Sequence, residues 1–311
     1  MIDFTNAERR NKWYTGANGG KLCVIYEGEQ YMLKFPPHPT KNQEMSYANS
    51  CISEYIGSHI FESVGIMAQK TLLGTYKVNG KDRIVVACRD FTSDVVSLQD
   101  FASLKNTVID SGHNGYGTEL SEIENTIETQ TVVDVQTLKD WFWDVFVIDA
   151  FIGNWDRHNG NWGFLYDRSS DCITIAPVFD CGSALFPQMT EENMLTTLTR
   201  QGELNHRIFN VPLSSIKEND KKINYYEFIT SLKKDECNEA IKRIVPKINM
   251  SKISDIISEI PCISVAQKVF YETILSERKK MILDVAFSRL QQLEPIKEQK
   301  EKVAPKRNVK L

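Results

Sequence analysis

The sequence predicts an α+β protein of two lobes, a small β-rich N-terminal lobe and a larger, mostly helical C-terminal lobe. Short β-branched and aromatic runs dominate up to about residue 90, whereas apolar positions from residue 97 onward recur every three or four residues. The 311 residues suffice for two such units, and the apolar content of 41% and charged content of 25% are ordinary for a folded protein. We therefore expect an N-lobe over residues 1–90, a C-lobe over residues 91–292, and a basic, mobile tail over residues 293–311.

The expected N-lobe contains two hairpins with one helix between them. A turn at residues 27–29 separates the first pair of strands, and Asn79-Gly80, a frequent hairpin dipeptide, separates the second pair. Alternation along the second strand places Lys34 on the face opposite to Leu33. In chain order, the expected elements are strands 22–26 and 31–35, a helix over 42–64, and strands 70–78 and 83–88.

Helical periodicity dominates the expected C-lobe. Apolar residues between Leu138 and Ile152 are spaced by three and four, which predicts a helix with a wide buried face. A second long helix is expected over residues 265–290, whereas residues 153–215 are expected to form short strands and loops. The glycine-rich stretch 111–117 has no periodicity, which is typical of a surface loop.

Charge, cysteine usage and hydropathy exclude several classes of protein. The 37 Lys and Arg against 41 Asp and Glu give a net charge of −4, which does not favour phosphate backbones, so no nucleic acid partner is expected. The seven cysteines are scattered without a C-x-x-C pair, which indicates reduced thiols. We find no secretory signal and no apolar stretch of the roughly 20 residues that span a bilayer. A cytoplasmic protein without a transmembrane segment is therefore expected.

The densest polar cluster, residues 153–161, directly follows the most apolar helix and precedes an apolar strand. It contains Asp156 and, five residues later, Asn161, while a second loop ends in Asp180. Phosphoryl transfer needs a carboxylate that orients or deprotonates the attacking hydroxyl, and hard oxygen ligands that hold Mg²⁺ against nucleotide phosphates. Because the offset of five residues equals that of the protein-kinase catalytic loop, these residues indicate phosphoryl transfer, with Asn161 and Asp180 as metal ligands.

Each of these residues also has a structural explanation. Asp180 with Gly182 is by itself a turn signature, and Asp156 with Arg157 could form an ion pair at a helix end. His158 is either a supporting residue of the loop or a core histidine that donates to a carbonyl, and both remain open. The order of the parts along the chain favours the functional interpretation, because it matches the order of the parts that phosphoryl transfer needs. The parts are a glycine turn, a strand lysine, a helix glutamate, the Asp-to-Asn loop and the Asp turn.

A glycine-rich segment near the N-terminus has the composition of a phosphate-binding turn. Its three glycines permit positive φ and bring backbone N–H groups near a ligand, although its Asn-Gly step is also an ordinary hairpin dipeptide. Lys34 lies mid-strand among apolar neighbours, where an unpaired ammonium is costly, so we expect an anion and a helix glutamate beside it. Glu54 and Glu44 both follow, and Glu54 is preferred because it adjoins the more apolar part of the helix. The segment consists of Gly16, Ala17, Asn18, Gly19, Gly20 and Lys21.

The loop Gly153-Asn154-x-Asp156-Arg157-His158-x-x-Asn161 resembles the corresponding loop of the HipA-like serine/threonine kinases, and Phe179-Asp180 resembles their metal-binding Asp. The similarity extends more loosely from the glycine turn to the C-terminal helices and so covers nearly the whole chain. The resemblance implies a two-lobed, protein-kinase-like fold, ATP and Mg²⁺ as cofactors, transfer to Ser or Thr of a protein substrate, and frequent autophosphorylation.

The resemblance also implies a role for each matching residue. Residues 16–21 would lie over the phosphates, Lys34 would contact the α and β phosphates, and Glu54 would hold Lys34. Asp156 would be the base, Asn161 and Asp180 would hold metal, and His158 would support the catalytic loop. The adenine contacts would be Ala87, Cys88 and Arg89.

Two departures from the family pattern bear on partners and on the adenine site. The glycine turn opens at residue 16, which leaves no room for the additional N-terminal subdomain of full-length members and makes an antitoxin partner and operator binding doubtful. The hinge has Ala87-Cys88-Arg89 in place of the acidic, aromatic stretch expected there.

Two other functions remain as alternatives. A phosphoinositide-type lipid kinase has a similar Asp-Arg-His-x-x-Asn pattern, but its catalytic domain usually presents a basic membrane-facing surface, and basic clustering here is confined to the tail. A catalytically silent kinase fold could have lost Lys34, Asp156, Asn161 or Asp180, and all four are present. An active protein kinase is therefore favoured, acting in the cytoplasm or, as a bacterial effector or toxin, in another cell after non-Sec delivery.

Overall fold

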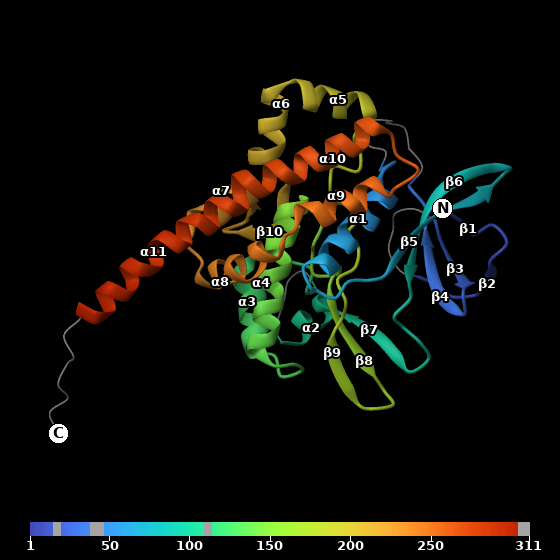
Figure 1. Ribbon diagram of the computed structural model, residues 1–311. Helices are drawn as coiled ribbons and strands as arrows, with labels where there is room; N and C mark the ends of the chain where they lie inside the picture. The colour runs from blue at the N-terminus through green and yellow to red at the C-terminus, as the bar shows by residue number, and fades with distance from the viewer. Residues whose placement is uncertain (15–19, 38–46, 109–113, 304–311) are drawn as a thin grey trace.

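A six-stranded sheet forms the smaller, N-terminal lobe of the computed structural model, which describes residues 1–14, 20–37, 47–108 and 114–303. The strand order is β1-β5-β6-β4-β3-β2, and every pair except the parallel β1 and β5 is antiparallel. One helix packs against the sheet on the side of the larger lobe (Figure 1). The elements are β1 Ile2–Asp3, β2 Glu8–Arg10, β3 Lys21–Tyr26, β4 Glu29–Lys34, α1 Ser50–Ser63, β5 Thr71–Val78 and β6 Lys81–Arg89.

Both predicted hairpins are confirmed. In the first, Glu27 and Gly28 have positive φ of 49° and 79°, and in the second, Asn79 and Gly80 have φ of 51° and 76°. Two consecutive residues with positive φ give the tight turn whose twist matches that of the flanking strands. The predicted antiparallel pairing of β3 with β4 and of β5 with β6 follows from these turns.

Helix α1 is shorter than the predicted 42–64. It begins at Ser50, residues 47–49 are not helical, and residues 38–46, which include Glu44, lie outside the described residues. Asn49 does not cap the helix with its side chain, which instead donates to the carbonyl of Met189. The start of α1 is thus tied to a distant segment of the chain, a contact that helical periodicity does not report. Its predicted end at Gly65 is confirmed, with φ of 85°.

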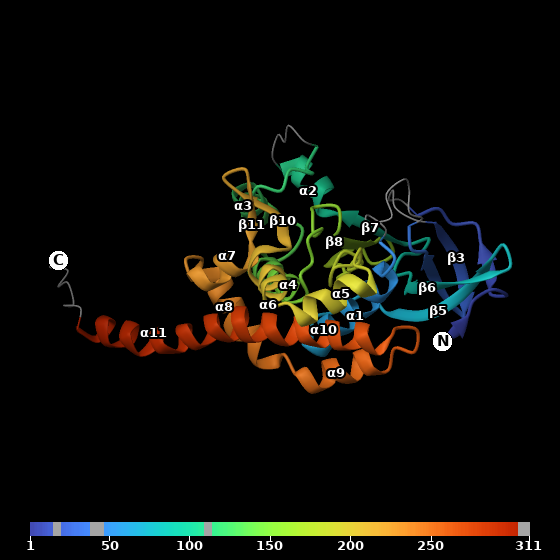
Figure 2. The ribbon, with the colours of Figure 1, turned by 90° about the horizontal axis from the view of Figure 1, so that it is seen from above.

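The C-lobe surrounds the buried helix α4, Val135–Ile152, which confirms the predicted helix of residues 138–152. A three-stranded antiparallel sheet lies beside the junction of the lobes, and helices cover the remaining sides (Figure 2). The elements before α4 are β7 Val96–Asp100, α2 Phe101–Val108 and α3 Leu120–Thr129. Those after α4 are β8 Gly163–Asp167, β9 Cys172–Ile175, α5 Glu191–Thr199, α6 Gln201–Asn205, β10 Leu213–Glu218, β11 Lys221–Asn224, α7 Tyr225–Ser231, α8 Asp235–Ile244, α9 Met250–Ser258, α10 Val265–Arg278 and α11 Asp284–Val303, with π-helical turns at His206–Asn210 and Lys279–Leu283 and a 3₁₀ turn at Val245–Lys247.

Two stretches contain helix beyond what the sequence predicted. The section expected to hold only strands and loops, 153–215, also contains α5 and α6. Helix α11 continues into the expected tail as far as Val303 and extends away from the body of the molecule (Figure 1), while the mobility of the tail stays a prediction. Glu, Lys and Gln dominate this stretch, and they are good helix formers.

One large apolar core joins α1 to the C-lobe, and a second, smaller core lies on the outer face of the N-lobe sheet. The site face of the sheet is therefore the one that carries α1 and meets the C-lobe. Within the described residues, no helix is both long and apolar enough to cross a bilayer.

Candidate active site

A lysine between two carboxylates joins the lobes. The Lys34 ammonium, at the end of β4, lies 3.1 Å from Oε2 of Glu54 on α1 and 3.0 Å from Oδ1 of Asp180 in the C-lobe. Glu54 is 1% exposed, and its second oxygen, Oε1, is buried without a hydrogen-bond partner among the described residues. The structure thus brings together the predicted strand lysine, helix glutamate and metal-loop aspartate, and it pairs Lys34 with Glu54, the preferred partner.

Lys34 and Asp180 influence each other's charge states, and Glu54 contributes to the charge on Lys34. Burial opposes the charge on Lys34, but the carboxylates of Asp180 and Glu54 outweigh it and raise the pKa of Lys34 well above its ordinary value. Lys34 in turn lowers the pKa of Asp180 below its ordinary value, against the effect of burial. Lys34 is therefore a permanent cation and Asp180 a permanent anion at neutral pH.

A second lysine stands directly across the hairpin from the first. Lys21 and Lys34 are cross-strand partners in the β3–β4 register, so both side chains project from the same face of the sheet. Burial lowers the pKa of Lys21, and the charge of Lys34 lowers it further. The carboxylates of Asp180 and Glu54 act in the opposite direction on the pKa of Lys21, so both lysines belong to one charged cluster.

Arg157 connects the polar loop of residues 153–161, which we call the catalytic loop, to the loop that carries Asp180, which we call the metal loop. Its guanidinium is 5% exposed and donates to both carboxylate oxygens of Asp149 on α4, at 2.9 and 3.2 Å. Nη1 also donates to the backbone carbonyls of Asn161, at 3.0 Å, and of Phe179. Because one nitrogen contacts both carbonyls, the two loops that carry Asn161 and Asp180 converge, as the sequence predicted.

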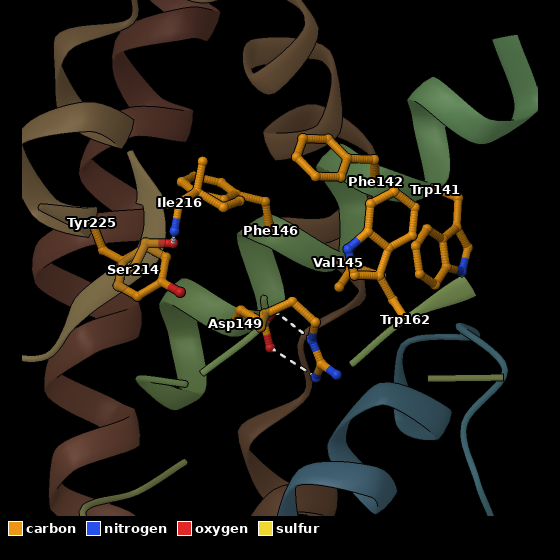
Figure 3. A pocket seen from close by; sticks show the side chains of 10 residues that line it. Trp141, Phe142, Val145, Phe146, Asp149, Trp162, Ser214, Ile216 and Tyr225 are labelled. Carbon is orange, nitrogen blue, oxygen red and sulfur yellow. Dashed lines mark hydrogen bonds and ion pairs between the residues drawn. The ribbon is translucent and has the colours of Figure 1, made fainter. Parts of the chain in front are cut away.

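A small cavity lies behind this junction, on the side of the C-lobe core. Figure 3 shows Asp149 and its ion pair at one wall of the cavity, with the aromatic side chains of α4 around it. The remaining lining comes from Trp162 and from residues of β10 and α7. The cavity is therefore an interior space behind residues 153–161, and Lys34, Glu54 and Asp180 do not line it.

Asp156 and Asn161 are oriented by contacts within the loop. Nδ2 of Asn161 donates to the Asp156 carbonyl at 2.8 Å, which leaves the amide oxygen of Asn161 to face a ligand. Asp156 itself is half-buried, and burial raises the pKa of its carboxyl, with the charge of Asp180 adding to the effect of burial and His158 opposing it. Asp156 and Asp180 are thus close enough to repel each other.

His158 is not a core histidine that donates to a carbonyl. Its side chain is half-buried, and Nδ1 accepts a hydrogen bond from the backbone N–H of Gly160 at 3.0 Å. That contact shapes the turn between Asp156 and Asn161, which matches the supporting role implied by the family resemblance.

Asn159 braces the same loop from behind, and sequence reasoning missed it. Its amide Nδ2 donates to the carbonyls of Gly115 and Gly117, each at 2.8 Å. The fully buried ammonium of Lys105 donates to the same Gly117 carbonyl at 2.5 Å. The stretch 111–117, expected to be a surface loop, therefore supports the catalytic loop with residues 114–117, while residues 109–113 lie outside the described residues. Lys105 follows Leu104 and precedes Asn106, so its sequence neighbours give no signal of this contact.

The predicted adenine contacts are distributed over both faces of the sheet. Ala87 belongs to the outer core of the N-lobe, whereas Cys88 belongs to the core on the site face. The backbone of Arg89 is already paired, since its N–H donates to Lys70 and its carbonyl accepts from Gln69. An acidic and aromatic pair, Asp90-Phe91, follows directly, and the Phe91 ring lies 5.8 Å from that of Phe179.

The predicted phosphate-binding turn is described only at its end. Gly16, Ala17, Asn18 and Gly19 lie outside the described residues. Gly20 accepts a hydrogen bond from the N–H of Phe35 at 3.1 Å, which holds the start of β3 against the end of β4, close to Lys34. The role of residues 16–21 stays a prediction.

Comparison with known proteins agrees with this geometry. The family described as HipA-like C-terminal domain matches residues 14–252. The chain is 48% identical over 290 residues to the serine/threonine-protein kinase CtkA of Helicobacter pylori (strain J99), covering 93% of this chain and 88% of the relative. It is similar to the crystal structure of a Helicobacter pylori proinflammatory kinase CtkA, with a TM-score of 0.89 and 48% identity, over 94% of this chain and 98% of that one.

A more distant structure is similar in fold alone. HipA of Shewanella oneidensis MR-1, solved with HipB and its operator DNA, has a TM-score of 0.56 and 12% identity, over 92% of this chain and 67% of that one.

The fold and the site together define a two-lobed kinase. The chain belongs to the HipA-like family, and it is a kinase enzyme.

Proposed function

We propose that this kinase transfers the γ-phosphoryl group of ATP, with Mg²⁺, to a serine or threonine hydroxyl of a protein, and that it phosphorylates itself. The observation that carries the proposal is the contact of Lys34 with both Glu54 and Asp180 across the two lobes. Phosphoryl transfer depends mainly on positioning and on stabilisation of charge, and this contact fixes a cation next to a metal-binding type of carboxylate. The acceptor class is the one named for the relative that is 48% identical.

The cationic face of the β3–β4 hairpin supports the choice of a nucleoside triphosphate. Lys34 and Lys21 project from the same face of the sheet, and Lys34 keeps its charge because two carboxylates hold it. The phosphates of a nucleotide would accept charge-assisted hydrogen bonds from this cationic face. ATP is the proposed donor, with its adenine end at the segment that leaves β6.

Asn161 and Asp180 offer the kind of oxygen atoms that a magnesium ion binds. The amide oxygen of Asn161 is oriented by the bond of its Nδ2 to Asp156, and Asp180 uses Oδ1 for Lys34, which leaves Oδ2. Amide and carboxylate oxygens are the ligands that Mg²⁺ prefers, and such a site needs only one or two of them beside the phosphates. When bound, Mg²⁺ would neutralise charge on the phosphates.

Asp156 is the proposed base. Its carboxylate accepts the proton of the attacking hydroxyl, or orients that hydroxyl, and burial favours the protonated form enough to make proton uptake easier than for an ordinary aspartate. His158 keeps the loop in shape through its bond from Gly160 and takes no proton in this scheme.

Transfer of label from γ-³²P-ATP tests the proposal directly. The purified chain is incubated with a general protein acceptor, with and without Mg²⁺, and the phosphorylated residues are mapped by mass spectrometry. We expect Mg²⁺-dependent phosphoserine or phosphothreonine on the acceptor and on the chain itself. Phosphoinositide vesicles in a parallel reaction test the lipid-kinase alternative, and label on lipid alone would overturn the proposal.

Lys34→Met is the variant that links the activity to the site. We expect kcat/KM to fall by about 100-fold or more, because the nucleotide loses its fixed cation and Glu54 and Asp180 are left without theirs. Lys77→Met is the matched control, since Lys77 is exposed and its nearest ionic partner, Asp82, is 3.9 Å away. Equal rates in Lys34→Met and the control would remove Lys34 from the site.

A further inference from the structure

Asp90 is a buried carboxylate that the proposed chemistry does not use. It directly follows β6, at the start of the interlobe linker, which we define as residues 90–95 between β6 and β7. Its side chain is 5% exposed. An ionised group in such a place is costly unless its surroundings replace the lost water.

Five donors converge on this carboxylate. Oδ2 accepts from the Tyr14 hydroxyl at 2.7 Å and from Nε2 of Gln30 at 2.8 Å, and it forms an ion pair with Nζ of Lys12 at 2.8 Å. Oδ1 accepts from the backbone N–H of Thr92 at 2.8 Å and from its hydroxyl at 2.6 Å. Burial opposes ionisation, but the bonds from Lys12, Thr92 and Tyr14 outweigh it, so the pKa of Asp90 is lowered. Asp90 is therefore fully ionised and fully paired.

The donors come from three segments that are distant in the sequence. Lys12 and Tyr14 lie in the stretch just before the predicted phosphate-binding turn, and they point inward while Trp13 between them is 97% exposed. Gln30 lies on β4 in the same alternation as Lys34, so both stand on the site face of the sheet. A backbone bond from the N–H of Asp90 to the carbonyl of Gln30, at 2.8 Å, reinforces the link.

The linker is fastened to the same point. Thr92 donates two hydrogen bonds to Asp90, and Lys12 donates to the Thr92 hydroxyl at 2.8 Å. Lys12 therefore contacts both Asp90 and Thr92. The segment that leads into the predicted phosphate-binding turn, the strand of Lys34 and the linker at the proposed adenine end therefore have fixed positions relative to one another.

We propose that Asp90 is a positioning residue for the nucleotide, which holds the interlobe linker and residues 12–14 in register with the strand of Lys34. The inference rests on the proposed function, because it assumes that ATP lies between the linker and Lys34. Asp90 does not contact the reacting atoms, so its loss weakens nucleotide binding and leaves the chemical step nearly unchanged.

Asp90→Asn, an isosteric change, tests the proposal through the separation of KM from kcat. We expect the KM for ATP to rise by about tenfold or more, with kcat within about threefold of the unaltered chain. The dissociation constant for ATP, measured by titration calorimetry, rises by the same factor. Asp82→Asn, at an exposed aspartate of β6, is the control and leaves both constants unchanged.

Tyr14→Phe removes a single donor and keeps the ring, so it serves if Asp90→Asn does not fold. We expect a smaller rise in the KM for ATP in Tyr14→Phe. In the double variant the KM should rise by less than the product of the two single effects, because both substitutions remove the same hydrogen bond. Unchanged ATP affinity in both variants would overturn the inference. It would also be overturned if kcat fell in proportion to the unfolded fraction of the variant, as measured in a thermal melt. Absence of phosphoryl transfer by the unaltered chain would refute the proposed function instead.

Discussion

At the scale of single residues, the surroundings of Asp156 and Asp180 shift the pKa values of the two carboxyls in opposite directions. Lys34 lowers the pKa of Asp180, whereas burial and the charge of Asp180 raise the pKa of Asp156. Pairs of acids whose environments separate their pKa values divide the work between them. Asp180 remains an anion fit for a metal, and Asp156 becomes the better proton acceptor.

Asp156→Asn should remove activity without destabilising the fold. We expect kcat to fall by about 10²- to 10⁴-fold, the usual contribution of a general base, when phosphoryl transfer is measured. Because the folded-state pKa of Asp156 is raised, its ionised form costs stability at neutral pH, and this cost disappears as the pH falls through that pKa. The melting temperature of the Asn variant at neutral pH should therefore equal or exceed that of the unaltered chain.

The same pKa shift predicts the acid limb of the rate profile. Activity requires ionised Asp156, so kcat should fall on acidification at a pH above the ordinary range of an aspartate. Asp255→Asn, at an exposed position of α9, is the control and should change neither activity nor melting temperature. A melting temperature clearly lower in Asp156→Asn would contradict the assigned charge state.

At the scale of elements, the contact of α1 with the metal loop depends on a missing side chain. A Cβ on Gly57 would lie 2.6 Å from Cβ of Cys181, the residue after Asp180. Gly57 follows Glu54 by three residues, so both lie on one side of the helix. The absence of a side chain at Gly57 thus lets α1 bring Glu54 to Lys34.

Gly57→Ala should therefore lower both stability and activity. Alanine favours the helix by about 1 kcal/mol, but overpacking against Cys181 costs about 1–3 kcal/mol and moves α1 away from the metal loop. Thermal melting and kcat/KM for ATP measure the two effects. Gly202→Ala in α6 is the matched control, because its Cβ would meet nothing within 4 Å, and this variant should be as stable as the original or more so.

A second substitution identifies the cause. Cys181→Gly in the Gly57→Ala background removes the clashing Cβ and should restore part of the activity. If the double variant is no more active than Gly57→Ala, the contact between α1 and Cys181 does not position Glu54.

Local sequence signals predicted some elements of this fold and missed others. Strands β3 and β4 were predictable because alternation and a two-residue turn are local features, and α4 because its apolar period extends over 18 residues. The beginning of α1 was not predictable, since the bond from Asn49 to Met189 links residues 140 positions apart. The brace from Asn159 to Gly115 and Gly117 was missed for the same reason.

At the scale of the whole molecule, the lobes are joined by apolar packing and by the charged contact of Lys34 with Asp180. Helix α1 belongs to the main core together with the C-lobe helices, and Lys34 connects the N-lobe sheet to Asp180. At the other end, α11 leaves the body of the molecule, as Figure 1 shows. The π-helical turn before α11 and the first turn of α11 belong to the core, because Ile282, Leu283 and Ala286 are at most 1% exposed.

Truncation at two points should distinguish these parts. Removal of residues 294–311 should leave the melting temperature and kcat/KM unchanged, because the site and the core lie elsewhere. Removal of residues 279–311 deletes the buried side chains of Ile282, Leu283, Ala286 and Leu290 and should prevent folding, as seen by loss of the cooperative melt. A drop in kcat/KM after the shorter truncation would show that the tail takes part in catalysis.

The sequence by itself determined the order of the chemical parts and the class of the enzyme. An aspartate and an asparagine five residues apart in a polar loop, and a lysine on an apolar strand, are local patterns that can be read from the sequence. Only the tertiary structure decided which glutamate meets Lys34, how Arg157 joins two loops, and that Asp90 collects three segments at the linker. These contacts connect residues far apart in the chain, and their energies depend on burial, which a pattern of residue types does not specify.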